Sequence, residues 1–127
     1  MVDKKIRVGL VGAGKTGTPL LEQLLDADFI EVVGVADVDF GAPGILLAKE
    51  KGIFITRDFL DIAKMGKKVD LIIETTGIPE VRQQLRWFMK ETGNNHTIIV
   101  PELVAILMQS LAAGKLVETY HGYQKYL

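Results

Sequence analysis

Apolar and polar positions alternate along this chain in blocks that predict strands and helices in turn. Short, nearly continuous apolar runs are typical of buried strands, whereas apolar residues three and four apart indicate amphipathic helices. We expect strands at about 5–11, 29–36, 54–56, 69–74 and 97–100. We expect helices at about 16–26, 44–51, 58–65, 79–91 and 101–113. This alternation indicates an α/β fold with a parallel sheet.

The connections between these elements predict a doubly wound, mostly parallel sheet of the Rossmann type. Right-handed helical crossovers give the strand order 3-2-1-4-5, and apolar strands agree with helices on both faces. Residues 115–127 allow several interpretations: a linker, a sixth strand over 115–120, or an association segment. Leu116, Tyr120, Tyr123 and Leu127 are spaced four, three and four apart, so on a helix they would form one apolar stripe.

A glycine-rich turn follows the first predicted strand and opens the first predicted helix. Gly12, Gly14 and Gly17 have the spacing G-x-G-x-x-G, and Asp37 ends the second strand twenty positions later. In the dinucleotide fingerprint the first glycine permits the turn, the second lets the backbone approach the pyrophosphate, and the third allows close helix packing. The helix start offers free N–H groups to phosphates. The pattern therefore predicts a dinucleotide site.

The acid at the end of the second strand bears on the choice of cofactor. A carboxylate at Asp37 accepts hydrogen bonds from ribose hydroxyls and repels a 2′-phosphate, so NAD is expected and NADP less so. The turn after the fourth strand should border the nicotinamide. The expected cofactor-binding residues are Gly12, Ala13, Gly14, Lys15, Thr16, Gly17, Asp37, Thr75, Thr76 and Gly77.

An alternative interpretation overlaps the same loop. The run from Gly9 to Thr16 also fits the P-loop pattern G-x-x-x-x-G-K-[ST] of nucleotide hydrolases. A P-loop would expose Leu10 and Val11, which fit better as the buried end of a strand. We favour the dinucleotide interpretation and keep the P-loop as an alternative.

Composition narrows the function classes further. The 127 residues, 48% of them hydrophobic, suit a single domain over 1–127. With 15 basic and 16 acidic residues, the chain has no excess of positive charge that would indicate binding to nucleic acid or to an anionic membrane. No run approaches the roughly 20 apolar residues of a membrane span, and no signal peptide is expected. The absence of cysteine excludes thiol catalysis and fits the cytoplasm, and with only two histidines no metal site is expected.

The stretch 6–37, together with Val-Asp-Leu-Ile-Ile-Glu-Thr-Thr-Gly at 69–77, resembles the N-terminal domain of the glucose–fructose oxidoreductase and inositol dehydrogenase family. Homoserine dehydrogenase and dihydrodipicolinate reductase have similar cofactor domains. The resemblance reaches about residue 113 and implies that Gly12, Gly14, Gly17 and Asp37 bind NAD. A looser resemblance, in Ala-Pro-Gly-Ile at 42–45 and Ile-Glu-Thr-Thr-Gly at 73–77, is to Rossmann domains of bacterial sensor histidine kinases.

The chain departs from those oxidoreductases in two ways that bear on catalysis. We expect no counterpart of their second domain within these 127 residues. The sequence also reads Val-Pro-Glu-Leu at 100–103, where those enzymes carry a lysine in Glu-Lys-Pro. The candidates for a proton donor are Glu74, Glu102, Thr75 and Thr76. We therefore expect an NAD-binding module with a sensory or regulatory role. The alternative is the cofactor domain of an NAD-dependent oxidoreductase. Attachment to another domain or a homodimer is expected, because apolar surface should stay exposed where a second domain would dock.

Overall fold

The computed structural model describes residues 4–117, which form a parallel sheet flanked by helices. The strands are β1 (Ile6–Val11), β2 (Ile30–Ala36), β3 (Ile55–Thr56), β4 (Leu71–Glu74) and β5 (Ile98–Val100). The helices are α1 (Gly17–Asp26), α2 (Pro43–Glu50), α3 (Leu60–Ala63), α4 (Pro79–Glu91) and α5 (Glu102–Ala113), with a short 3-10 helix η1 (Gly66–Lys68).

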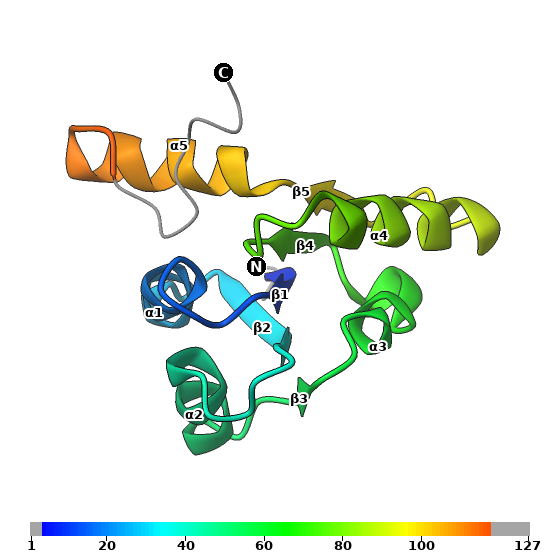
Figure 1. Cartoon of the computed structure of the whole chain (residues 1–127), viewed down its shortest axis with the longest axis horizontal. Helices are drawn as coiled ribbons and strands as arrows, with labels where there is room; N and C mark the ends of the chain where they lie inside the picture. Colours follow the sequence, from blue (N-terminus) through cyan, green and yellow to red (C-terminus); the bar gives the residue numbers. More distant parts are fainter. Residues whose placement is uncertain (1–3, 118–127) are drawn as a thin grey trace.

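The sheet has the order β3-β2-β1-β4-β5, and every pair of neighbouring strands is parallel. The predicted Rossmann topology is therefore confirmed. Figure 1 shows α1 and α2 to the left of the sheet, α3 and α4 to its right, and α5 along the top. The carboxyl ends of β1 and β4 lie side by side, at the point where the chain changes direction along the sheet.

Two apolar layers hold the helices to the sheet. Because side chains alternate along a strand, Leu10 of β1 faces the layer of α1 and α2, whereas Val11 faces the layer of α3 and α4. Leu21 and Ile45 fill the first layer, and Leu85 fills the second. The helices that flank the candidate site are thereby packed against the strands that end at it.

Three details differ from the sequence-based expectations. The strand at 54–56 is only Ile55–Thr56, and the helix expected over 58–65 is reduced to α3 before the left-handed Gly66, with φ of 63°. Residues 115–117 form no strand: after the left-handed Gly114, two backbone N–H groups turn back to Ser110. The rest of the expected sixth strand or apolar stripe, over 118–127, lies outside the described residues.

Candidate functional site

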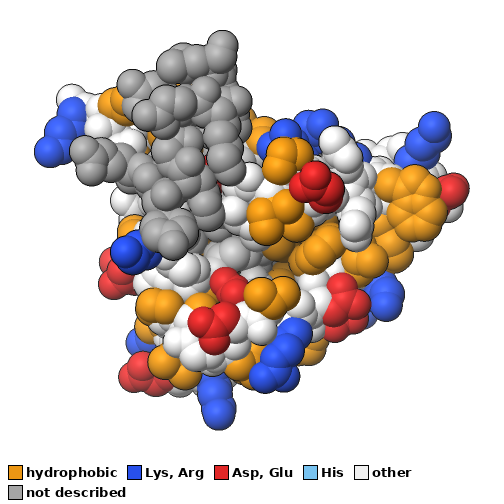
Figure 2. Space-filling view, viewed as in Figure 1, with side chains coloured by type: hydrophobic (Ala, Val, Ile, Leu, Met, Phe, Trp, Pro, Cys, Tyr) orange, Lys and Arg blue, Asp and Glu red, His pale blue; other side chains and the backbone are white. Residues whose placement is uncertain are grey.

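A cleft opens where the glycine-rich loop after β1 meets the loops after β2 and β4. Its volume is about 440 Å³, and ligand pockets commonly measure roughly 300–1,000 Å³. The described residues that line it are Val11, Gly12, Gly14, Lys15, Thr16, Gly17, Ala36, Asp37, Val38, Arg57, Phe59, Thr75, Thr76, Ile78 and Val81. Figure 2 shows the surface in the orientation of Figure 1, with hydrophobic side chains gathered near the middle and right among charged ones. The cleft lies at the edge of the sheet where the sequence placed a ligand.

Two glycines of the loop are required by the fold itself. Gly12 has a φ of 102°, which side-chain-bearing residues rarely adopt. A Cβ at Gly17 would lie 2.0 Å from the carbonyl oxygen of Gly12, so α1 can start this close to the loop only with glycine there. Both positions therefore shape the turn before any ligand arrives.

Gly14 differs from these two because nothing within residues 4–117 requires glycine at this position. A Cβ added there would meet no atom of the described residues within 4 Å, and the φ of Gly14 is not in the left-handed region. The position lines the cleft. An open position of this kind lets a ligand approach the backbone where a side chain would obstruct it.

Asp37 is bound to the glycine-rich loop. Its Oδ2 accepts a hydrogen bond of 2.8 Å from the backbone N–H of Ala13, and its Oδ1 accepts one of 2.9 Å from the N–H of Asp39. The sequence predicted a ribose-binding acid and did not predict this link between the β1 and β2 loops. A carboxylate has about four acceptor directions, so both oxygens keep capacity for further donors.

The start of α1 presents polar groups beside the cleft. The hydroxyl of Thr16 is buried, and within residues 4–117 it has no hydrogen-bond partner. The side chain of Lys15 is exposed at the same loop. Thr18 is used internally, since its hydroxyl donates to the carbonyl oxygen of Ala13 over 2.9 Å. Thr16 is thus a buried hydroxyl at a helix start that a bound anion would satisfy.

A second support of the loop comes from α2. The backbone N–H of Gly44 donates to the carbonyl oxygen of Ala13 over 2.9 Å. A Cβ at Gly44 would lie 2.7 Å from the Cβ of Ala13, so only glycine allows α2 to approach this closely. Gly44 was not predicted to take part in the site, although the sequence places it directly after Pro43 at the start of a predicted helix.

The loop after β4 forms the opposite wall. The hydroxyl of Thr75 lies 3.1 Å from the carbonyl oxygens of both Val11 and Gly12, which ties this wall to the glycine-rich loop. Glu74 is fully buried, and its Oε2 accepts hydrogen bonds from the N–H and hydroxyl of Thr76 and from the N–H of Gly77. Its Oε1 lies 3.9 Å from Arg82 Nη1. Glu74 therefore holds the loop in shape from beneath.

The remaining wall is largely apolar and was not predicted as part of the site. Val38 follows β2, Phe59 precedes α3, and Ile78 and Val81 lie at the start of α4. Arg57 also lines the cleft, and its guanidinium carbon lies 4.0 Å from the centre of the Phe40 ring. The signal in the sequence for Val38 was an apolar residue next to Asp37, in the loop that follows β2. The others depend on how α3 and α4 pack.

Most of the expected binding residues come together at this cleft. Ala13 and Gly77 are not among its lining residues: both are buried, and their N–H groups donate to the carboxylates of Asp37 and Glu74. Two of the possible proton donors are wrongly placed for that role, because Glu74 and Glu102 are both fully buried and neither lines the cleft. The segment 100–103, where the resembling oxidoreductases carry their lysine, does not line the cleft either.

The structure contradicts the P-loop alternative. Leu10 and Val11 belong to β1 and pair with β2 and β4, so they are not in a phosphate loop. Gly9 has a packing reason of its own, since a Cβ there would lie 2.4 Å from Cγ2 of Ile62. The loop that follows β1 therefore begins at Gly12.

Among residues 4–117, no group of three or more His, Cys, Asp or Glu side chains is placed to hold a metal ion. In the same part of the chain, no helix has both the length and the apolar content to cross a membrane.

Fold and glycine-rich loop define a Rossmann-type α/β domain of the kind found in NAD-dependent dehydrogenases. No protein-family model matches the chain. Acetaldehyde dehydrogenase of Shewanella pealeana (strain ATCC 700345 / ANG-SQ1) is 39% identical over 57 residues, which are 45% of this chain and 19% of that enzyme. The chain thus spans about a fifth of the length of the curated relatives that it matches first.

Solved structures agree with the resemblance found in the sequence. GenD2 from gentamicin A biosynthesis, in complex with NAD, has a TM-score of 0.59 and 19% identity, over 87% of this chain and 32% of its own. Scyllo-inositol dehydrogenase from Lactobacillus casei, with NAD(H) and scyllo-inositol, has a TM-score of 0.56 and 18% identity, over 87% of this chain and 33% of its own. The fold expected from the inositol dehydrogenase resemblance is therefore confirmed.

Proposed function

We propose that this domain binds NAD at the cleft between the β1 and β4 loops and acts as a sensory or regulatory module. The observation that carries the proposal is Gly14. The fold needs glycine at Gly12 and Gly17, but it leaves the position of Gly14 open to the cleft. A pyrophosphate bound against the backbone at this position would explain why the residue is glycine.

The polar groups around Gly14 fit such a ligand. The hydroxyl of Thr16, which is buried and lacks a partner among the described residues, would donate to a phosphate oxygen at the start of α1. Lys15 adds a positive charge beside it. The apolar wall at Val38 and Phe59 suits the flat face of an adenine, and NAD-bound neighbours such as GenD2 support the choice of dinucleotide.

We infer a preference for NAD over NADP from Asp37. Its carboxylate lies at the end of β2, where the adenosine ribose is held in this fold. A 2′-phosphate there would face a negative charge that already supports the glycine-rich loop. We therefore expect NADP to bind more weakly than NAD, and its 2′-phosphate to disturb the hydrogen bond by which Asp37 supports the loop.

A module without its own chemistry fits the cleft better than an enzyme does. A dehydrogenase needs a proton donor beside the nicotinamide. Among the acids considered for that role, Glu74 and Glu102 are buried away from the cleft. The second candidate function is the cofactor domain of a larger NAD-dependent dehydrogenase, which the partial match to acetaldehyde dehydrogenase favours.

Calorimetric titration of NAD, NADH, NADP and ATP into the purified chain tests the proposal. We expect NAD or NADH to bind with a stoichiometry of one and NADP to bind more weakly. Binding of ATP with no binding of any dinucleotide would contradict it. Oxidation of an added aldehyde or alcohol by the chain alone would favour the second candidate over a regulatory module.

A further inference from the structure

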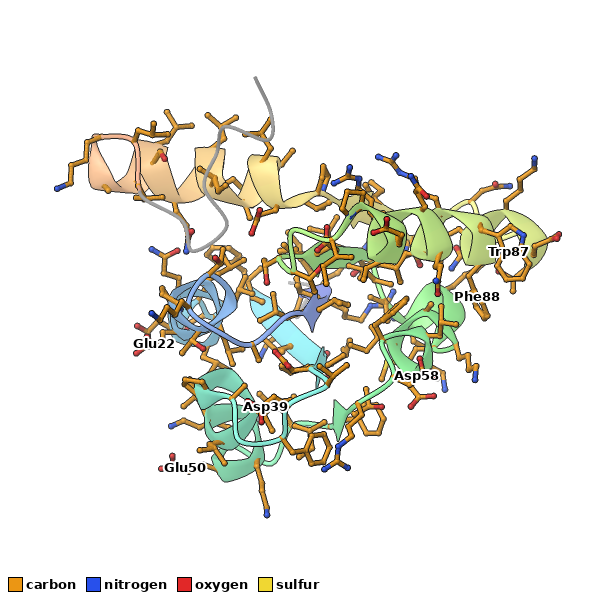
Figure 3. The ribbon with its side chains drawn as sticks, viewed as in Figure 1. Glu22, Asp39, Glu50, Asp58, Trp87 and Phe88 are labelled. Carbon is orange, nitrogen blue, oxygen red and sulfur yellow. The ribbon has the colours of Figure 1, made fainter. Side chains whose placement is uncertain are left out.

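The cleft covers one end of the sheet and not the other. Its described lining residues lie at or after the carboxyl ends of β1, β2, β3 and β4, and none of them belongs to β5 or α5. In Figure 3, Asp39 and Asp58 mark the loops that follow β2 and β3 on the lower side of the view, whereas α5 runs along the top. In a doubly wound fold, the adenosine half of a dinucleotide lies over β1 to β3 and the other nucleotide over β4 and β5. The cleft therefore matches the adenosine half and the diphosphate.

The turn after β4, which separates the two halves, has already used its hydrogen-bond donors. The backbone N–H of Thr75 donates to the carbonyl oxygen of the last residue of β1, and so does its hydroxyl. The N–H groups of Thr76 and Gly77 donate to Glu74, as does the hydroxyl of Thr76. The N–H of Ile78 donates to the hydroxyl of Thr76 over 3.1 Å. Within residues 75–78, the carboxamide oxygen of a nicotinamide would find no N–H or O–H left to bind.

The carboxyl end of β5 offers the nicotinamide no polar partner either. Pro101 connects β5 to α5, and a proline has no N–H to donate. Glu102, the first residue of α5, is fully buried. The exposed residues of the first turn are Leu103 and Val104, and both are apolar. No exposed side chain within residues 101–104 could therefore hold and orient a carboxamide.

The adenosine end differs because it keeps groups for a ligand. Both oxygens of Asp37 retain acceptor capacity for ribose hydroxyls after their two hydrogen bonds from the backbone. The buried hydroxyl of Thr16, which has no partner among the described residues, would donate to the diphosphate. Val38 and Phe59 add an apolar surface for the adenine ring. The contacts open to a ligand are thus concentrated on its adenosine diphosphate part.

We propose that the site recognises the adenosine diphosphate part of its ligand and is insensitive to the nicotinamide ring. This inference rests on the proposed function, since it concerns the same cleft. NAD and NADH differ in the nicotinamide ring alone, and that ring would lie over the end of the sheet that offers it no donor. ADP-ribose has the same adenosine and diphosphate, so it should bind as well as either. The module then reports the amount of such ligands and not the ratio of NAD to NADH.

A second hollow, of about 290 Å³, lies between α1 and α5. It meets the cleft at Lys15 and Thr16, and the amide side chains of Gln23 and Gln109 line it. Its described lining residues belong to these two helices or lie next to them in sequence, and none lies at the end of β4 or β5. A nicotinamide that reached these amides would give NAD an advantage over ADP-ribose. A comparison of the two ligands therefore tests this placement as well.

Calorimetric titration of NAD, NADH, ADP-ribose and nicotinamide mononucleotide into the full chain tests the proposal. ADP-ribose is the matched ligand, because it keeps the diphosphate and both riboses of NAD and lacks the nicotinamide. The dissociation constants of the three ADP-containing ligands should agree within about fivefold, since a single hydrogen bond changes affinity by roughly two- to tenfold. Nicotinamide mononucleotide, the other half of NAD, should not bind at the same concentrations.

Two variants locate the binding. Gly14→Val should abolish the binding of ADP-ribose as it does that of NAD, whereas Leu103→Ala, at the start of α5, should leave both affinities unchanged. Circular dichroism checks that both variants are folded.

Several results would overturn the inference and leave the NAD site standing. They are a difference of more than about fivefold between any two of the three ligands, binding of nicotinamide mononucleotide, and a loss of affinity for NAD alone in Leu103→Ala. Binding of ADP-ribose that survives Gly14→Val also overturns it, because the ligand would then occupy another site. If none of the three ADP-containing ligands binds, the proposed function is itself wrong.

Discussion

The strongest test of the site is the replacement of Gly14 by valine. At this position a Cβ would have no neighbour within 4 Å in the part of the chain that the structure describes. The backbone φ is ordinary as well, so the described domain accommodates a side chain. We expect the free energy of unfolding to change by no more than about 1 kcal/mol. The side chain would, however, stand between the loop backbone and a bound pyrophosphate.

The loss of binding can be estimated from the contacts that the side chain blocks. A hydrogen bond to a charged group contributes about 1.5–3 kcal/mol. The loss of one such contact weakens binding about ten- to a hundredfold, and the loss of two abolishes it in a usual titration. Gly14→Ala, with a single methyl group, should lie between the wild type and Gly14→Val.

Gly17→Ala is the contrasting variant. Its Cβ would lie 2.0 Å from the carbonyl oxygen of Gly12, so it should destabilise the fold by about 1–3 kcal/mol even without ligand. The assay combines thermal unfolding of each variant, with and without NAD, and calorimetric titration. Saturating NAD should raise the melting temperature of the wild type and leave that of Gly14→Val unchanged. Unchanged NAD affinity in Gly14→Val would refute the reasoning.

Three further predictions concern charged groups. Asp37→Asn should reduce the ratio of NAD affinity to NADP affinity by about ten- to a hundredfold, because it removes a charged acceptor. Titration of both cofactors measures this ratio, and equal binding of both by the wild type would contradict the role assigned to Asp37. Lys15→Ala should weaken NAD binding only severalfold in a titration, since backbone donors would hold the phosphates in the proposed complex. An ATPase activity that is lost in this variant would contradict the proposed site. Hydrogen bonds from Arg7 hold the pKa of Asp70 well below its ordinary value of 3.8. Because that pKa is lowered in the folded state, the stabilisation is complete at neutral pH and declines as pH falls below about 4. Asp70 and Arg7 form a partly exposed ion pair, so Asp70→Asn should lower the free energy of unfolding at pH 7 by about 1 kcal/mol. The melting temperature of the variant should depend less on pH below about 4 than that of the wild type, and an equal dependence on pH would refute this.

The local pattern of the chain was enough to predict the fold and the glycine-rich turn at which the cleft opens. Apolar runs separated by amphipathic stretches indicated the strand order, because parallel strands need helical crossovers. The spacing of Gly12 and Gly17 predicted the turn after β1, and the structure shows the positive φ and the close contact that require them. These features depend on residues close together in the sequence.

Only the tertiary structure decided which polar groups face the cleft. Glu74 and Thr75 are neighbours in sequence, yet the carboxylate turns beneath the β4 loop while Thr75 bonds to the β1 loop. The hydrogen bond from the Ala13 N–H to Asp37 was not predicted from the sequence, nor was the exposure of apolar side chains on α5. In each case the outcome depends on packing between distant segments, which sequence periodicity does not encode.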